Sequence, residues 1–134
     1  HTRMLLESHA IDFVVANIKP ARLKKIENHQ KAFEKALKEE NVRGLFHHNR
    51  AFHQAMFDAC GNSIVTELID QLRKRSRVWF HYFRASSDQR EYSVRDHLEM
   101  IEALNARDAE WLKKINERHL ITGYESYKKF MILM

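Results

Sequence analysis

The sequence contains little of the chemistry that builds turns, disulfides or membrane spans. Its 134 residues include three glycines, one proline and one cysteine, Cys60. So few turn-forming residues exclude a many-stranded sheet and favour long helices joined by short loops. A single cysteine excludes an internal disulfide framework and is typical of a reducing compartment. No apolar run approaches the roughly 20 residues of a membrane span, and no secretory signal is visible, so we expect a cytoplasmic protein with no membrane partner.

The composition is that of one globular domain, and we predict a single domain over residues 1–134. Hydrophobic residues make up 44% and charged residues 31%, with a formal net charge of +5. This charge indicates either nucleic-acid contact or a solvated basic surface. The basic residues are spread along helical faces without a recognition-helix or zinc-finger pattern, which favours the solvated surface. The chain begins at His1 already in a helical pattern, so we expect a partner domain upstream.

Apolar residues recur at helical spacing along most of the chain. Pro20 ends a first helix or opens the second, and Asn41 is a candidate N-cap of the third. Gly61-Asn62 ends that helix and restarts the chain, and Ser93-Val94-Arg95-Asp96 resembles a capping box after a short loop at residues 91–93. The predicted helices span residues 3–18, 20–40, 42–60, 63–83, 93–104 and 108–130. The sequence therefore predicts an all-α fold, an antiparallel helical bundle of about six to seven helices.

The helix at residues 42–60 carries two polar residues in the middle of its buried face. Asn49 and His53 are four residues apart, so they lie one turn above each other on the same side. The apolar residues on that side are Leu45, Met56 and Cys60. Both polar side chains can bind a metal, and both are predicted to lie in the core.

Two later histidines, His97 and His119, are predicted to point inward from two other helices. A single inward histidine is usually a satisfied core residue, but three such imidazoles and an amide cost several kcal/mol when unpaired. A shared metal would offset that cost, because neutral imidazoles suit zinc, nickel, copper, iron or manganese, and Asn49 could complete the site. The other histidines belong to no such cluster and are expected at the surface: His1, His9, His29, His47, His48 and His81.

Several short segments match one family in order and spacing over nearly the whole chain. They are Arg3-Met4-Leu5-Leu6-Glu7, Asn49-Arg50-Ala51-Phe52-His53, Gly61-Asn62, Asp96-His97 followed by Ile101, Ala103-Leu104 and Asp108, and Arg118-His119-Leu120. Together they resemble the FCD domain, the C-terminal effector-binding domain of FadR-subgroup GntR-type bacterial transcription regulators. The resemblance implies a helical bundle that holds a divalent metal through Asn49, His53, His97 and His119, with a small carboxylate effector completing the coordination.

The same resemblance implies zinc as the metal, with nickel, manganese or iron as alternatives. It also implies a homodimer and operator DNA bound by an N-terminal winged-helix domain that is absent from this chain. The chain departs from the family at Asn49, where aspartate is commonest. The lost charge is expected to weaken metal binding and to make the site more cationic. Asp96 stands where the family tends to have glutamate, and we expect it to contact no ligand.

The helix predicted at residues 63–83 places Arg75 on its inward stripe, where a guanidinium needs a partner. That partner is either a carboxylate of the effector or a buried acid, and the sequence leaves both open. Tyr82 and Asn116 border the same predicted central metal and ligand cavity, and Arg3 is a weaker candidate. The stripe reads Ile64, Leu68, Leu72, Arg75, Trp79 and Tyr82. The predicted effector is a small organic acid or sugar acid.

The sequence thus predicts a ligand-sensing domain that is not an enzyme. The main alternative is a small helical metalloenzyme, a metal-assisted hydrolase, which needs a general base near the metal. Asp58 and Glu102 are the acids nearest to the ligands in sequence, and neither shares the inward face. A third alternative, a bundle without a small-molecule site, leaves four buried polar residues without a shared partner.

Overall fold

The computed structural model describes residues 1–75 and 87–133. This part of the chain forms six α-helices and no strand, so the all-α prediction is confirmed. The helices are α1 (Thr2–Asn17), α2 (Pro20–Lys38), α3 (Val42–Asp58), α4 (Ser63–Arg75), α6 (Ser87–Asn105) and α7 (Ala109–Leu133). Among these described helices, none combines the length and apolar character needed to cross a membrane.

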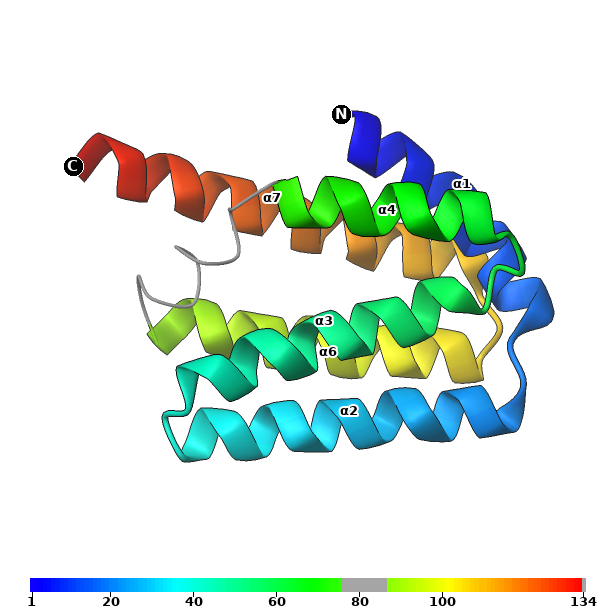
Figure 1. The fold of residues 1–134 in the computed structure, drawn as a ribbon, viewed down its shortest axis with the longest axis horizontal. Helices are drawn as coiled ribbons and strands as arrows, with labels where there is room; N and C mark the ends of the chain where they lie inside the picture. Colours follow the sequence, from blue (N-terminus) through cyan, green and yellow to red (C-terminus); the bar gives the residue numbers. More distant parts are fainter. Residues whose placement is uncertain (76–86, 134) are drawn as a thin grey trace.

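Successive helices run in alternating directions along the long axis of the molecule (Figure 1). In this view α2, α3 and α6 form the lower half, and α1, α4 and α7 form the upper half. α2 packs along α3 and α6, while contacts of α7 with α6 and of α1 with α3 join the two halves. The result is the predicted antiparallel bundle, with its core between the halves.

Local capping explains where the helices begin and end. The Asn41 side chain accepts a hydrogen bond from the Gly44 backbone N–H at 3.0 Å, as its predicted N-cap role requires. Gly61 adopts a left-handed backbone with φ 79°. The Asn62 side chain then accepts hydrogen bonds from two backbone N–H groups at the start of α4. Pro20 is the first residue of α2. These sequence predictions are confirmed.

The predicted start of the helix before His97 is wrong. α6 begins at Ser87, so the expected loop at residues 91–93 is helical, and Ser93 is buried inside the helix. The side chain of Asp96 does not close a capping box, because its carboxylate bonds to side chains of α7 instead. A local pattern was therefore overridden by contacts between helices.

The predicted inward stripe of α4 is also wrong. Ile64 and Leu68 are 69% and 45% exposed, whereas Thr66 and Ile69 are buried. The helix is turned by about one residue relative to the prediction, which moves each side chain by roughly 100° around the axis. The predicted continuation to residue 83, with Trp79 and Tyr82, lies outside the described residues.

Arg107 links the turn before α7 to the end of α1 through two hydrogen bonds. Its guanidinium donates to the carbonyl oxygens of Val15 and Ile18, both at 3.2 Å. Carbonyls at a helix end lack partners within the helix, so these bonds satisfy groups that the helix leaves open. The backbone of Arg107 is left-handed, with φ 53°, which costs about 1–2 kcal/mol for a residue other than glycine.

We expect Arg107→Ala to lower the free energy of unfolding by about 1–3 kcal/mol, because two charged hydrogen bonds are lost and the strain remains. Arg107→Gly should cost less, since glycine tolerates the left-handed conformation. Urea unfolding followed by circular dichroism measures both changes. Lys24→Ala, at an exposed position of α2, is the control. Equal stability of Arg107→Ala and the parent would show that these two hydrogen bonds do not stabilise the fold.

Candidate metal centre

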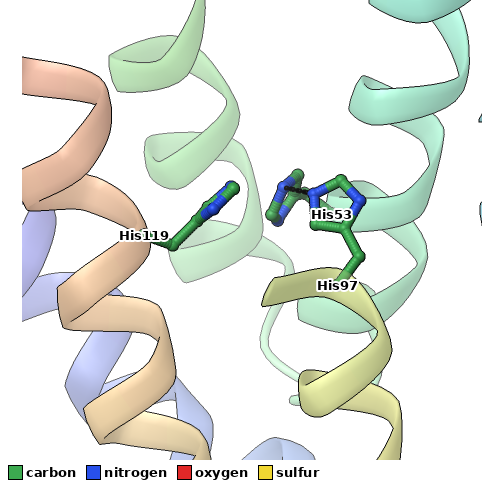
Figure 2. Close-up of side chains that lie close together, drawn as sticks. All are labelled: His53, His97 and His119. Atoms are coloured by element: carbon green, nitrogen blue, oxygen red, sulfur yellow. Dashed lines mark hydrogen bonds between the residues drawn. The ribbon is translucent and has the colours of Figure 1, made fainter. Parts of the chain in front are cut away.

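Three helices bring His53, His97 and His119 into one buried cluster. The residues come from α3, α6 and α7, and each is at most 3% exposed. Figure 2 shows the three imidazoles pointing toward one another. One nitrogen of each ring lies within 4.8 Å of the corresponding nitrogens of the other two. The prediction that these three side chains point inward together is confirmed.

The spacing of the ring nitrogens fits a single metal ion. The Nε2 atoms of His53 and His97 lie 3.2 Å apart. Two nitrogens at about 2.0–2.1 Å from one zinc ion, at angles between octahedral and tetrahedral, are separated by roughly 2.8–3.4 Å. The ring centroid of His119 lies 5.3 Å from the ring centroid of His53 and 5.1 Å from that of His97. Modest side-chain rotation would therefore bring all three onto one ion.

Aromatic packing fixes the orientation of the His97 ring. The Phe52 ring stacks on it with centroids 4.2 Å apart and an angle of 17° between the planes. Phe33 approaches the ring as well, at 5.2 Å. Phe52 belongs to the main apolar core and Phe33 to a smaller cluster between α2 and α3. The imidazole of His97 is thus held between two apolar clusters.

Hydrogen bonds behind two of the rings orient their Nε2 atoms toward the centre of the cluster. His97 Nδ1 lies 2.8 Å from Gln30 Oε1, and His119 Nδ1 lies 3.1 Å from Asp96 Oδ2. Both oxygens accept a hydrogen bond from Nδ1–H, so the lone pair of each neutral ring is on Nε2. Arg118 in turn donates to Asp96 Oδ1 at 2.6 and 3.1 Å. Such outer partners are typical of histidines that bind metal.

Gln30 and Asp96 contact the histidine cluster, and the sequence prediction missed both contacts. Asp96 was expected to touch no ligand, whereas its carboxylate bonds to His119. A signal for Gln30 was present, since it follows Ile26 by four residues and precedes Phe33 by three, on the buried face of α2. Both residues are buried, and a buried polar side chain requires a partner.

Asn49 supplies an oxygen that suits the same ion. Its side chain is 4% exposed, and it lies one turn before His53 on α3. Its Oδ1 atom has no hydrogen-bond partner among the described residues. A buried acceptor without a partner costs about 1–3 kcal/mol. Coordination of a cation would offset this cost, so the four predicted ligands fit a metal.

Burial lowers the pKa of all three histidines. The positive charge of Arg73 adds to this effect for His53, and the neighbouring His119 and Arg73 add to it for His97. The pKa of His119 falls for the same reason, although its hydrogen bond to Asp96 opposes the effect. Each imidazole is therefore neutral near pH 7, which is the form that binds metal.

A buried glutamate and two half-buried arginines lie near the cluster. Glu7 is fully buried; its Oε2 pairs with Arg3 Nε at 2.7 Å and its Oε1 with Arg73 Nη1 at 3.4 Å. Burial and the charge of Arg3 lower the pKa of Arg73 to about 9, although Glu7 opposes this shift. The positive charge of Arg73 lowers the pKa of all three histidines, so Arg73 contributes a positive electrostatic potential at the cluster.

The residues predicted to contact the effector differ in where the structure places them. Arg75 is exposed and lines an open apolar groove between α1 and α4, so its predicted inward position is wrong. The rotation of α4 places Arg73 inward instead. Arg3 is half-buried, and Asn116 is buried with its Oδ1 lacking a partner among the described residues. Tyr82 lies outside the described residues.

The remaining histidines stay apart from the cluster. Among the described residues, His53, His97 and His119 form the one group of three or more histidine, cysteine or acidic side chains close enough to share an ion. His81 lies outside the described part of the chain. The others are exposed or half-buried and lie outside the cluster: His1, His9, His29, His47 and His48.

Comparison with known proteins places these features in one family. The sequence profile of the FCD domain matches residues 1–122. The HTH-type transcriptional regulator McbR of Escherichia coli strain K12 is 25% identical over 135 residues, which cover 95% of this chain and 60% of that protein. The solved structure of E. coli McbR/YncC has the same fold, with a TM-score of 0.86 at 21% identity over 96% of this chain and 65% of that one.

Proposed function

Because this chain belongs to the FCD domain family, we propose that it is the ligand-sensing domain of a bacterial transcription regulator of the GntR type. The cluster of three buried imidazoles from three helices carries the proposal. In the full regulator, residues 1–134 would form one effector-binding and dimerisation domain. A separate N-terminal winged-helix domain would bind operator DNA, in keeping with the name of the E. coli relative and with the partial coverage of its length.

In this proposal, His53, His97, His119 and Asn49 hold one divalent metal. Three nitrogen ligands and an amide oxygen suit zinc, and nickel, manganese or iron are alternatives. The hydrogen bonds of His97 to Gln30 and of His119 to Asp96 would orient the rings. All four ligands are neutral, so the ion would keep its full positive charge and attract an anion.

The proposed effector is a small organic acid or sugar acid whose carboxylate completes the coordination. The inward guanidinium of Arg73 and the nearby Arg3 favour an anion at this place. Asn116 on α7, three residues before His119, offers a further polar contact. These residues belong to α1, α4 and α7, so an effector would link the upper helices to the cluster.

Such a link can shift a conformational equilibrium. The ligands come from both halves of the bundle, His53 and His97 from the lower half and His119 from the upper. An effector that binds one arrangement of the halves more tightly would increase the population of that arrangement. In a homodimer this would change the spacing of the two DNA-binding domains.

Calorimetric titration of small carboxylates into the zinc-loaded and the metal-free domain tests the proposal, after elemental analysis of both samples. We expect about one equivalent of metal after loading and dialysis, and carboxylate binding that depends on the metal. A domain that retains no transition metal, or that binds carboxylates equally well without it, would overturn the proposal.

We expect Asp96→Asn to weaken metal binding about 10–100-fold, because outer partners of metal-bound histidines contribute on this scale. The amide loses the negative charge that holds Nδ1–H of His119 in place. Competition with a chromophoric chelator measures the affinity. Glu99→Gln is the matched control, since Glu99 also pairs with Arg118, at 2.8 Å, but bonds to no histidine. Equal effects of the two variants would argue against this role of Asp96.

The hydrolase alternative has little support. Asp58 and Glu102, the acids considered as general bases, are exposed. Asp96 is the carboxylate that contacts the cluster, but Arg118 and His119 hold it. Burial would raise the pKa of Asp96, yet these two partners lower it below its ordinary value, so it is a poor base near neutral pH.

A further inference from the structure

A small pocket opens between α3 and α4 at Asn49, one of the proposed metal ligands. It is lined by Phe46, Asn49, Arg50, Asp70, Arg73 and Lys74, and its volume is about 160 Å³. We call it the α3–α4 pocket. Asn49 connects it to the histidine cluster, because this residue lines the pocket and lies one turn before His53.

Cationic side chains outnumber acids around the α3–α4 pocket. Asp70 Oδ2 pairs with Arg50 Nη2 at 3.3 Å and with Lys74 Nζ at 2.9 Å. Partial burial would raise the pKa of Asp70, but these two cations lower it, so Asp70 is ionised and already engaged.

The same excess of positive charge continues behind the pocket. Arg73 reaches inward from the pocket wall to Glu7, which also pairs with Arg3. In the part of the chain that the structure describes, four cationic side chains thus share two carboxylates in this region. The cations are Arg3, Arg50, Arg73 and Lys74, and the acids are Glu7 and Asp70.

Asn49 adds no negative charge at the junction of pocket and cluster. Its amide carries no charge, and its buried Oδ1 has no partner among the described residues. Building on the proposed function, we infer that the effector is a small dianion. One of its anionic groups would bind at the metal held by the histidines. The second would occupy the α3–α4 pocket against Arg73, Arg50 and Lys74.

Charge and size both favour a dianion over a monocarboxylate. A divalent ion with four neutral ligands keeps two positive charges in a buried site, and a single carboxylate would neutralise one of them. The second anionic group would receive charge-assisted hydrogen bonds from the pocket. A volume of 160 Å³ equals roughly five water molecules at about 30 Å³ each, enough for a carboxylate and a short carbon spacer.

The test compares succinate with butyrate, which has the same carbon chain and one carboxylate fewer. Both are titrated calorimetrically into the zinc-loaded chain at fixed ionic strength. We expect succinate to bind at least about tenfold more tightly. Arg50→Gln/Lys74→Gln should reduce succinate affinity on the order of tenfold and leave butyrate affinity unchanged, because only the second carboxylate meets these cations.

Two further variants sharpen the test. Lys31→Gln/Lys35→Gln removes the same charge from exposed positions of α2 and should change neither affinity by more than about twofold. Asn49→Asp should raise zinc affinity and lower succinate affinity, each on the order of tenfold, because the new charge attracts the metal and repels the second carboxylate. Opposite changes of this kind do not arise from simple loss of folding.

The outcomes separate the two proposals. No zinc uptake by the parent would overturn both the proposed function and this inference. Zinc uptake with equal affinity for the two acids would overturn the dianion alone. Equal losses in the Arg50/Lys74 and Lys31/Lys35 variants would also overturn it, since they would reveal a general effect of net charge.

Discussion

A His53→Ala/His97→Ala double variant is expected to lose tight metal binding altogether, while the parent retains about one equivalent after dialysis. The two Nε2 atoms lie 3.2 Å apart, and both belong to the predicted ligand set. Removing two of four ligands leaves His119 and the weak amide ligand Asn49, too few for a stable zinc site. Elemental analysis of both proteins after identical loading gives the result.

The matched control is His47→Ala/His48→Ala, which removes two histidines from the same helix outside the cluster. This variant should retain the parental metal content. Thermal unfolding with and without zinc adds a second readout. At a free metal concentration 1,000 times Kd, binding stabilises the parent by about 4 kcal/mol, and the cluster variant should show no such shift. Equal metal content in both double variants would exclude the proposed centre.

The second large effect concerns pH. In the metal-free chain, the free energy of unfolding should fall by up to about 3 kcal/mol as the pH decreases from 6.5 to 5.5. Burial lowers the pKa of His53, His97 and His119 in the folded state, whereas the unfolded chain protonates near pH 6.5. In this range the unfolded state binds more protons, so acid favours unfolding, by up to about 1.4 kcal/mol per histidine and pH unit.

Urea unfolding in the presence of a chelator, at several pH values, measures this dependence. The comparison is His53→Leu/His97→Leu, which fills similar space without a titratable group and should show a much flatter curve. Asp70 and Asp96 have pKa values below the ordinary aspartate value, so their contribution is lost only in stronger acid. Parallel curves for parent and variant would contradict the assignment.

The histidine cluster could be predicted from sequence because helical spacing alone decides the face on which each residue lies. His53, His97 and His119 each continue an apolar stripe that the structure buries. The family assignment, which depended on short segments in a fixed order, is confirmed by the profile match over residues 1–122. The fold class followed from the scarcity of glycine and proline, and it is confirmed as well.

The orientation of α4 could not be predicted in the same way. Its apolar residues support two stripes one residue apart, and local sequence does not choose between them. Packing against α1 and α3 buries Ile69 and leaves Leu68 exposed. This choice brings Arg73 inward instead of Arg75. The bonds from Gln30 and Asp96 to the histidines were missed because they join side chains on different helices.

The distance along the chain between the clustered histidines has a consequence for local unfolding. His53 and His97 are 44 residues apart in sequence, and His119 follows on a third helix. Without a shared ion, α3, α6 and α7 can open separately, and their backbone amides can exchange with solvent at different rates. An ion bound to all three would make each opening break a coordination bond. The amides of the three helices would then exchange as one cooperative unit. Metal binding would therefore slow the exchange of backbone amides far from the metal site.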